Sequence, residues 1–277
     1  MFFKSFELLK YKLIRYIESN YKLNLLIYNN IHLFKFLLPH EKDYYGMRLV
    51  CKNNPKDIIL DIGASLGISS LGFIKLGFKN KIYAFEPNYI LYKKYLTKNL
   101  KKYKNINTKN IALGSTNGTK TMYMPFYNSN CIHYFCSFDK KYLINSIKIT
   151  FPNLIKNLKI QKKRITCRKF DDLKLKLKPK FVKIDTEGFD EYVLRGMKKT
   201  IKKYKPVFLV EYNKEYFNNI KNILKDYLPY IYDLKKNVMI PLPPKINNKE
   251  ISRTNKENFL SIRNIYFIHK KKKIKKC

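Results

Sequence analysis

The 277-residue sequence has no tryptophan, and alanine occurs at only three positions, Ala64, Ala84 and Ala112. Acidic residues are also scarce: 20 aspartates and glutamates stand against 58 lysines and arginines, which gives a formal net charge of +38. Such a charge is typical of proteins that bind nucleic acid or an anionic membrane surface. Lysine, asparagine, isoleucine, tyrosine and phenylalanine are abundant, however, as expected from an AT-rich coding sequence. This bias weakens the positive charge as evidence for a binding surface.

Glycine is rare and unevenly distributed. Eight of the nine glycines and all three alanines lie between Gly63 and Gly196. Residues from disfavoured codons are expected to persist mainly where the backbone or the packing requires them. This interval therefore contains the most constrained part of the fold.

Cysteine occurs five times, without metal-site spacing, and Cys131 and Cys136 form the only close pair. We therefore expect a reduced, cytoplasmic protein and no metal centre. Charged residues interrupt every apolar run near the N-terminus, which argues against a secretory signal and a transmembrane segment.

The first part of the chain, 1–54, is predicted to be a helical N-terminal extension. Apolar and basic residues alternate over 1–38 at helical spacing, which favours two short helices that cap the main domain. Peripheral contact with a membrane is the alternative. The residues expected on the apolar side are Phe2, Phe6, Leu9, Leu13, Tyr16 and Ile17.

The segment Ile58–Gly67 is an apolar run that ends in a glycine turn with an acid at the break. A short, continuous apolar run is typical of a strand buried on both faces. Gly63 and Gly67 let the backbone approach a ligand closely. A helix beginning near Ser65 would point its amide groups at that ligand.

From Lys56 the pattern alternates between strand and helix, which predicts a parallel sheet that binds its ligand at the carboxyl edge. The expected strands are 58–62, 81–86, 106–112, 181–185 and 207–211, and the expected helices are 41–52, 65–77, 88–103, 188–203 and 214–226. A closing antiparallel pair is expected from 230–234 or 238–242 with 265–268.

The alternation is interrupted in the middle of the chain. Residues 114–127 predict a hairpin with Asn117-Gly118 as its turn. The insertion 128–164 is expected to hold one helix, at 139–147 or 151–160, and to cover the substrate, and 164–168 is strand-like. The predicted domain therefore spans 55–268, and the lysine-rich residues 269–277 form a disordered tail.

Acids recur at the carboxyl ends of the predicted strands: Asp61, Glu86 and Asp185, with Glu187 close behind. Glu86 lies 23 residues after Gly63, the spacing at which an acid binds both ribose hydroxyls of a nucleoside. A dinucleotide fingerprint requires a second glycine where this chain has a serine. An acidic loop suits S-adenosylmethionine, a sulfonium cofactor with an ammonium group, better than a pyrophosphate.

Four motifs in order and spacing resemble the FkbM family of S-adenosylmethionine-dependent methyltransferases. They are Asp61-Ile62-Gly63-Ala64-Ser65-Leu66-Gly67, Phe85-Glu86-Pro87-Asn88, Asn110-Ile111-Ala112-Leu113-Gly114 and Lys183-Ile184-Asp185-Thr186-Glu187-Gly188. The resemblance implies an α/β fold of the Rossmann-like class I methyltransferase type, with a mostly parallel seven-stranded sheet and helices on both faces. It also implies O-methylation, often of sugar hydroxyls in glycans, glycolipids or natural products.

The same resemblance implies roles for individual residues. The loop residues Asp61, Gly63, Ala64 and Gly67 would surround the methionine part of S-adenosylmethionine. The ribose would be held by Glu86, the adenine would be flanked by Asn110 and Ala112, and the transferring methyl group would lie beside Asp185 and Glu187.

A hydroxyl is a poor nucleophile until its proton begins to leave, so a base close to the acceptor is expected. The candidates are Asp185 and Glu187, which could instead cap the next helix. His133 in the insertion and Glu211 at the end of a strand are the other candidates. A divalent metal held by Asp185 and Glu211 lacks an evident third ligand.

Three functions follow from these patterns. The leading hypothesis is an O-methyltransferase that acts on a sugar-containing or other small-molecule acceptor. An RNA 2′-O-methyltransferase, suggested by the charge, is the first alternative, although the lysines of its catalytic tetrad cannot be placed. A non-catalytic nucleotide-binding or membrane-surface protein is the second.

Overall fold

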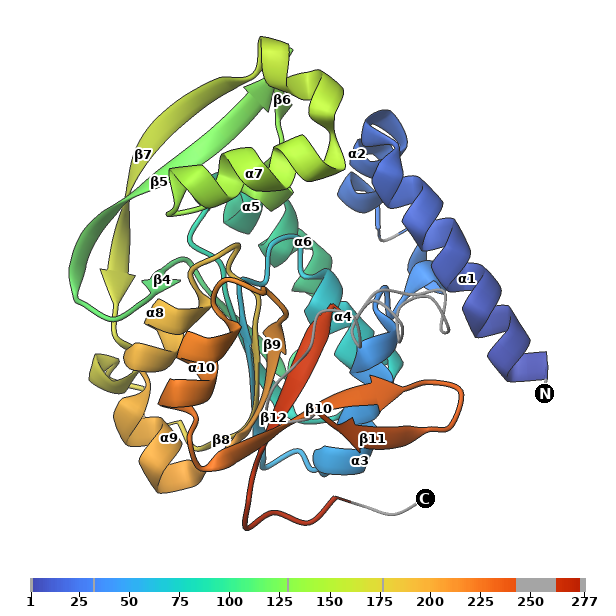
Figure 1. The fold of residues 1–277 in the computed structure, drawn as a ribbon, viewed down its shortest axis with the longest axis vertical. Helices are drawn as coiled ribbons and strands as arrows, with labels where there is room; N and C mark the ends of the chain where they lie inside the picture. Colours follow the sequence, from blue (N-terminus) through green and yellow to red (C-terminus); the bar gives the residue numbers. More distant parts are fainter. Residues whose placement is uncertain (1, 32, 129, 176, 243–262, 275–277) are drawn as a thin grey trace.

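The structure is a computed structural model that describes residues 2–31, 33–128, 130–175, 177–242 and 263–274 (Figure 1). Its centre is an eight-stranded sheet with the strand order β11-β10-β12-β9-β8-β1-β2-β3. The strands are β1 (Ile58–Ile62), β2 (Lys81–Phe85), β3 (Ile106–Lys109), β8 (Pro179–Ile184), β9 (Val207–Glu211), β10 (Tyr227–Asp233), β11 (Val238–Pro241) and β12 (Asn264–His269).

The five strands from β9 to β3 run parallel, and β12, β10 and β11 close the sheet in antiparallel pairings. The chain leaves β1 toward β2 and β3, and later returns to the other side of β1 through β8 and β9. Such a reversal opens a crevice at the carboxyl ends of the central strands. The predicted α/β fold with a mostly parallel sheet is confirmed, with eight strands instead of seven because both candidates for the closing pair, β10 and β11, join it.

Alternate residues of each central strand enter two hydrophobic cores, one on each face of the sheet. Ile59 and Phe181 pack on one face, and Leu60 and Val182 pack on the other. The first face is covered by α4 (Ile68–Lys75), by α5 (Tyr89–Leu91), the π-helical turn η3 (Tyr92–Leu96) and α6 (Thr97–Leu100), and by the N-terminal extension. The second is covered by α8 (Asp190–Arg195), α9 (Lys198–Tyr204) and α10 (Phe217–Ile223).

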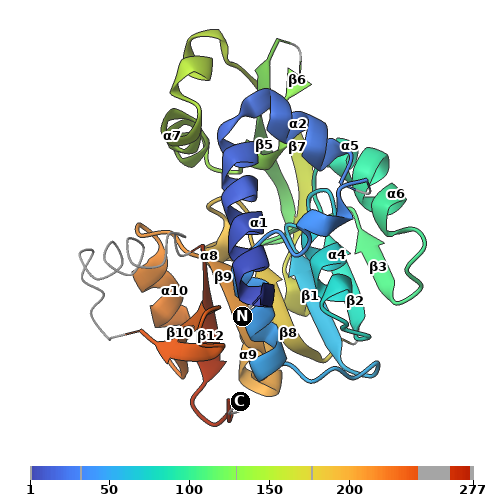
Figure 2. The same ribbon diagram turned by 90° about the vertical axis from the view of Figure 1, so that its right-hand side faces the viewer.

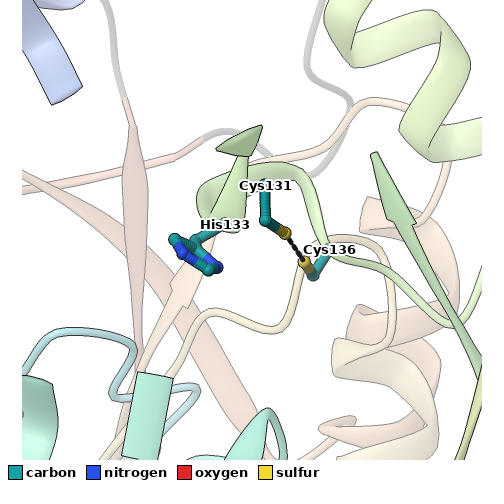
Figure 3. A group of neighbouring side chains, drawn as sticks. All are labelled: Cys131, His133 and Cys136. Atoms are coloured by element: carbon teal, nitrogen blue, oxygen red, sulfur yellow. Dashed lines mark hydrogen bonds between the residues drawn. The ribbon is translucent and has the colours of Figure 1, made fainter. Parts of the chain in front are cut away.

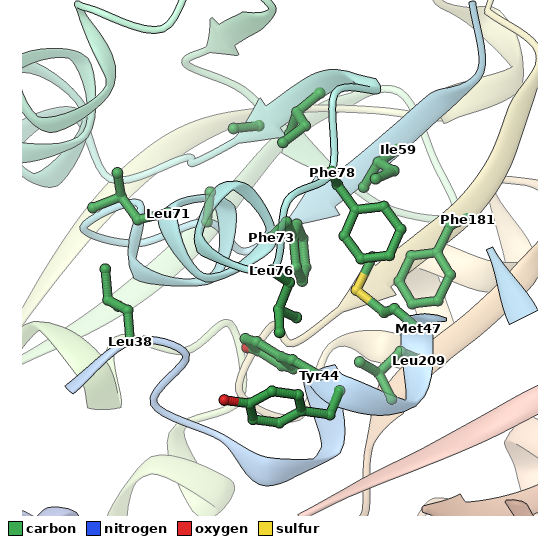
Figure 4. Packing of buried hydrophobic residues seen from close by; sticks show 14 of the residues in the cluster. Leu38, Tyr44, Met47, Ile59, Leu71, Phe73, Leu76, Phe78, Phe181 and Leu209 are labelled. Atoms are coloured by element: carbon green, nitrogen blue, oxygen red, sulfur yellow. The ribbon is translucent and has the colours of Figure 1, made fainter. Parts of the chain in front are cut away.

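The N-terminal extension is part of the first core. It comprises α1 (Phe2–Ser19), α2 (Tyr21–Asn29), η1 (Lys35–Leu37), η2 (Lys42–Gly46) and α3 (Met47–Val50), and α1 runs along the main domain in Figure 2. Tyr44 and Met47 pack against Phe73 and Phe181 (Figure 4). In the described parts of the chain, no helix combines the length and the apolar character that crossing a membrane requires.

The predicted apolar side of α1 is wrong for most of the residues that can be assessed. Leu9, Leu13 and Tyr16 are exposed, whereas Ile17 is buried as expected. Tyr11 and Ile14 are buried in their place. The error is one of helix rotation, because two apolar stripes run along this helix and the sequence does not reveal which one meets the core.

Residues 112–168 build a second sheet with the strand order β4-β7-β5-β6, drawn in green to yellow in Figure 1. Its strands are β4 (Ala112–Leu113), β5 (Gly118–Tyr127), β6 (Asn130–Cys131) and β7 (Lys159–Arg168). The hairpin predicted at Asn117-Gly118 is wrong, because β5 pairs along its length with β7. Strand β6 is followed by η4 (His133–Phe135), α7 (Lys140–Thr150) and η5 (Pro152–Asn157). Both helix positions predicted as alternatives, 139–147 and 151–160, therefore contain helix.

Other boundaries also move. Strand 106–112 divides into β3 and β4, and the helix predicted from 188 to 203 divides into α8 and α9. The short helix η6 (Phe170–Asp172) follows β7. In the predicted tail, His269 belongs to β12, the amide of Lys270 donates to the carbonyl of Asp226, and 275–277 lie outside the described residues.

Candidate functional site

The loop after β1 is held by its backbone. The amides of Gly63 and Ala64 both donate to the carbonyl of Phe85, each over 3.0 Å. Gly63 has φ +80°, and a Cβ there would lie 1.8 Å from the carbonyl oxygen of Asp185. Gly67 has φ +85° and caps α4. Gly63 therefore lets the loops after β1 and β8 meet where no other residue fits.

Asp61 lies beneath this loop and is fully buried, so it is not part of the wall of the cavity. One of its carboxylate oxygens accepts hydrogen bonds from the hydroxyls of Ser69 and Ser70, both over 2.6 Å. The other lies 3.7 Å from the ammonium of Lys183, which is also 3.1 Å from the carboxylate of Asp185. Asp61 thus holds α4 and Lys183 in place, a different position from the expected contact with the methionine part of the cofactor.

Lys183 is a buried cation between two carboxylates. Burial disfavours its charged form, but Asp185 and Asp61 outweigh burial and raise the pKa of Lys183 above its ordinary value. No role was predicted for Lys183 from the sequence, although a lysine between the apolar residues Val182 and Ile184 is a usable signal.

Glu86 is buried at the end of β2 and lines the cavity, as expected. Its two carboxylate oxygens accept hydrogen bonds from the amides of Ser65, over 2.8 Å, and Asn88, over 2.7 Å. Burial raises the pKa of Glu86 to about 7, and these two hydrogen bonds oppose the rise.

Ala112 lines the same cavity between Ile111 and Leu113, so the wall next to Glu86 is apolar. The side chain of Asn110 is exposed and donates to the backbone carbonyls of Glu86, over 2.8 Å, and Pro87, over 3.2 Å. Asn110 therefore holds the loop after β2 and is not part of the cavity wall.

These elements surround one cavity of about 630 Å³ at the carboxyl ends of β1, β2, β8 and β9. Volumes of this size are typical of sites for small molecules. The cavity extends beyond the sheet edge between the N-terminal extension and α7. The extension contributes Glu18, Asn24, Leu25, Tyr28, His40 and Glu41, and α7 contributes Tyr142, Ser146, Ile149 and Thr150.

Asp185, Glu187 and Glu211 come together in the wall of this cavity. Burial, followed by repulsion from Asp185 and Asp190, raises the pKa of Glu187 well above its ordinary value. Burial, followed by repulsion from Asp185 and Glu187, does the same to the pKa of Glu211. Two neighbouring carboxyl groups therefore hold their protons to an unusually high pH.

Asp190, at the start of α8, fixes the turn that carries Glu187. Its carboxylate accepts hydrogen bonds from the amide of Thr186, over 3.0 Å, and from its hydroxyl, over 2.9 Å. Glu187 itself has φ +52°, so the turn is strained at the residue that projects a carboxylate.

The insertion is fitted onto this turn. The Ser137 hydroxyl donates to the carbonyl of Glu187 over 2.6 Å. The ring of Tyr142 lies so close to Gly188 that a Cβ there would be 2.7 Å from Cγ of the ring. The Tyr142 hydroxyl is 3.4 Å from the Glu211 carboxylate, a long hydrogen bond. The insertion thereby reaches the acidic group, and its role as a substrate cover stays a prediction.

The N-terminal extension closes the opposite side. Arg263, which precedes β12, forms an ion pair with Glu18 and lies 3.7 Å from Glu41. Tyr28 donates to Glu18 over 3.2 Å. Burial opposes the charge of Arg263, but Glu18 and Glu41 raise its pKa above the ordinary value. The sequence offered no signal for this contact, because the two partners are far apart in the chain.

His133 lines the cavity beside Glu86, but a ring nitrogen of His133 lies close to the sulfur atoms of Cys131 and Cys136. Across the described residues, these three are the group of histidine, cysteine and acidic side chains that could converge on a metal ion. The fold thus brings together three possible metal ligands, which the spacing of the cysteines alone had not indicated.

The glycine loop, the acids at the strand ends and the cavity together define a Rossmann-like methyltransferase architecture. Residues 61–232 match the model of the methyltransferase FkbM domain, which is more than half of the chain. The chain belongs to the FkbM methyltransferase family. Membership implies a methyl donor of the S-adenosylmethionine type. No curated protein matches the sequence significantly.

Among solved structures, the chain is similar to a methyltransferase FkbM from Methylobacillus flagellatus, with 17% identity and a TM-score of 0.47. That alignment covers 92% of this chain and 57% of the other, so this chain spans little more than half of that protein. A precorrin-6y C5,15-methyltransferase from Geobacter metallireducens has 13% identity, a TM-score of 0.39 and coverage of 82% and 84%. A SAM-dependent O-methyltransferase from Thermotoga maritima has 12% identity and a TM-score of 0.38, and the alignment covers 85% of this chain and 67% of the other. These similarities are too low to indicate a substrate.

Proposed function

We propose that the chain transfers a methyl group from S-adenosylmethionine to a hydroxyl of a sugar-containing or related small-molecule acceptor. The observation that carries the proposal is the continuous cavity, which joins Glu86 at the end of β2 to the carboxylates Asp185, Glu187 and Glu211. One end fits a nucleoside and the other fits a hydroxyl that must lose a proton.

The residues at the first end fit the adenosyl group of the methyl donor. Glu86 offers acceptor oxygens to ribose hydroxyls, and Ile111, Ala112 and Leu113 offer an apolar wall to the adenine. The glycine turn brings the backbone of Gly63 close to the remaining part of the donor. S-adenosylmethionine supplies a methyl group on a sulfonium, whose positive charge suits a cavity lined by carboxylates.

The second end fits a neutral, hydroxyl-rich acceptor. Its wall combines aromatic rings with polar groups: Tyr134, Phe135, Phe138 and Tyr142 with Glu18, Asn24, Ser146 and Thr150. A polar set that can both donate and accept hydrogen bonds, on apolar surfaces, orients a sugar ring.

In the proposed reaction the acceptor oxygen forms a bond to the methyl carbon as the carbon–sulfur bond breaks, which leaves S-adenosylhomocysteine. The hydroxyl proton passes to Glu187 or Glu211. Their raised pKa values bring their basicity closer to that needed near neutral pH than an ordinary carboxylate offers. Asp185, held by Lys183 at 3.1 Å, fixes the geometry beside them.

The RNA alternative is less well supported by this site. A polyanionic backbone would meet the carboxylates Glu18, Glu41, Asp185, Glu187 and Glu211. Of the cavity's described cationic side chains, Lys183 and Arg263 are both engaged by carboxylates. A second lysine for the catalytic tetrad is not among the described residues that line the cavity.

Transfer of tritiated methyl groups tests the proposal, with mixed glycans, glycolipids and RNA offered as acceptors. Glu211→Gln should lower transfer by about 10²–10⁴-fold, the usual range for loss of a general base, while binding of the methyl donor persists. Glu187→Gln is compared in the same way. Glu215→Gln, an exposed acid on the same loop, is the matched control and should be fully active.

The pH profile provides a second readout. In the wild type, transfer should rise with pH through a range above that of ordinary carboxylic acids, because Glu187 and Glu211 must lose their protons to accept the acceptor's proton. Methylation of RNA with no methylation of carbohydrate would refute the acceptor class. Full activity of both glutamine variants would refute the assigned base.

A further inference from the structure

Three side chains of the insertion converge beside the cavity. Cys131 ends β6, His133 begins η4 and Cys136 follows it. Figure 3 shows the two sulfur atoms pointing toward each other with the His133 ring beside them. All three donor atoms lie within 4.8 Å of one another. This group takes no part in the methyl transfer described above.

The distance between the sulfur atoms matches that of two ligands of one tetrahedral ion. The Sγ atoms of Cys131 and Cys136 are 3.8 Å apart. Two thiolates bound at about 2.3 Å with a tetrahedral angle between them are separated by about 3.8 Å. A disulfide bond requires a separation of about 2.05 Å, so these sulfur atoms would have to approach each other substantially.

His133 distinguishes a metal ion from a disulfide bond. Its Nδ1 is buried and has no hydrogen-bond partner within the described part of the chain. A buried nitrogen without a partner is costly. A disulfide between the cysteines would leave this cost in place, whereas a metal ion bound by both sulfur atoms and by Nδ1 of His133 would remove it.

One neighbour of Cys136 is suited to orient a bound thiolate. The side-chain amide of Asn88 donates to the Cys136 sulfur over 3.6 Å. Asn88 is itself buried, and its carbonyl oxygen caps α5. Donors that point at ligand sulfur atoms orient them and tune the metal.

We propose that Cys131, His133 and Cys136 bind one Zn²⁺ ion in a tetrahedral site. Two thiolates and one imidazole form a ligand set that zinc prefers, and three protein ligands leave a fourth position for water or another ligand. His133 and Cys136 line the cavity, so that position is accessible from the cavity.

The ion would brace the insertion against the sheet edge. Cys131 pairs with Phe126 of β5, and Cys136 is followed by Ser137, which holds the carbonyl of Glu187. A metal ion bound across 131–136 therefore fixes the segment that holds the insertion against the turn of Glu187. The proposal does not depend on the identity of the acceptor.

Metal content is the direct test, measured by elemental mass spectrometry on untagged full-length protein. The wild type should hold one zinc per chain, and Cys131→Ser with Cys136→Ser should hold none. Cys51→Ser, which changes a buried cysteine elsewhere, is the matched control and should retain one zinc per chain. Equal zinc in the double variant and the wild type would overturn the proposal.

A second measurement needs no variant. Cobalt added to the metal-free wild type should give thiolate-to-cobalt charge transfer and the strong visible bands of a tetrahedral ion, and zinc should abolish both. Added zinc should also raise the melting temperature of the wild type, because it binds the native state. Absence of these bands, or a Cys131–Cys136 disulfide in the freshly purified protein, would overturn the proposal.

Discussion

Lys183 shows how a single charge organises this site. It lies inside the central strand β8, where it links Asp61 below the glycine loop to Asp185 in the cavity wall. A buried ammonium is tolerated only because both partners are carboxylates. The ion pairs therefore connect the loop after β1 to the acidic turn after β8.

Replacing Lys183 with methionine should be strongly destabilising, because Asp61 would remain buried with only its two serine partners. Loss of one member of a buried ion pair costs about 3–5 kcal/mol. Chemical denaturation measures the change in the free energy of unfolding. Lys180→Met, at an exposed position of the same strand, should change it by less than about 0.5 kcal/mol. Equal stability of the two variants would contradict the role of Lys183.

Because the pKa of Glu86 is raised, we expect donor binding to depend on pH. Its pKa is raised to about 7 in the folded protein, so the folded state binds more protons than the unfolded state between the ordinary carboxyl pKa and pH 7. Glu86 therefore lowers stability as pH rises through that window. Ribose hydroxyls donate to the ionised form, so affinity for S-adenosylhomocysteine should be about tenfold weaker at pH 6 than at pH 8.

Calorimetric titration at several pH values checks this expectation. Glu86→Gln carries no titrating group and should bind more weakly without the same pH dependence. A pH dependence that is equal in the wild type and in Glu86→Gln would assign the effect to another group.

At the scale of elements, the close approach of the loops after β1 and β8 is the tightest constraint in the site. Gly63 and Gly77 both have positive φ, but a Cβ at Gly63 meets the carbonyl of Asp185, whereas a Cβ at Gly77 meets nothing within 4 Å. Gly77→Ala should cost only the backbone strain, roughly 1–2 kcal/mol. Gly63→Ala should lower the free energy of unfolding by more than Gly77→Ala does and should weaken donor binding. Thermal melts measure the first effect and calorimetry the second. Equal melting temperatures of the two variants would disprove the constraint.

The sequence predicted the elements that are continuous and buried. Strand β1 has the predicted ends, because its apolar run is bounded by polar residues and a glycine turn. Strand β7 (Lys159–Arg168) begins with a mostly exposed, basic stretch that shows no apolar alternation, so only its end, 164–168, was predicted as a strand. The wrong hairpin at Asn117-Gly118 has the same cause. Because β7 was not predicted as the partner of β5, the local turn signal alone decided the prediction.

The candidate site was also predicted only in part from the sequence. Glu86, Asp185, Glu187 and Glu211 lie together at the cavity because parallel strands end at one edge, and their roles there stay predictions. Lys183 and the contact of Arg263 with Glu18 were missed, because such contacts depend on packing between distant segments.

At the scale of the whole molecule, the charge of the chain and the charge of its cavity differ in sign. The chain carries +38, yet the described acceptor end is lined by carboxylates whose cationic neighbours are already paired. We therefore expect RNA to bind weakly to the exterior, with an affinity that falls steeply with salt, and not to be methylated. Filter binding against salt, followed by methyl transfer at the same salt, checks this expectation; RNA methylation that persists at high salt would contradict it.

The N-terminal extension and the insertion close the cavity from opposite sides, and the sheet edge forms its floor. Under the proposed function, the sheet edge would bind the donor and the two added segments would select the acceptor. We propose that the glycine loop and Glu86 form the donor site.

Calorimetric titration of the wild type with S-adenosylmethionine tests that claim most directly, with Glu86→Ala titrated in parallel. The account predicts one molecule bound per chain and much weaker binding by the variant. No binding by folded wild type, or equal affinity of the two proteins, would contradict it.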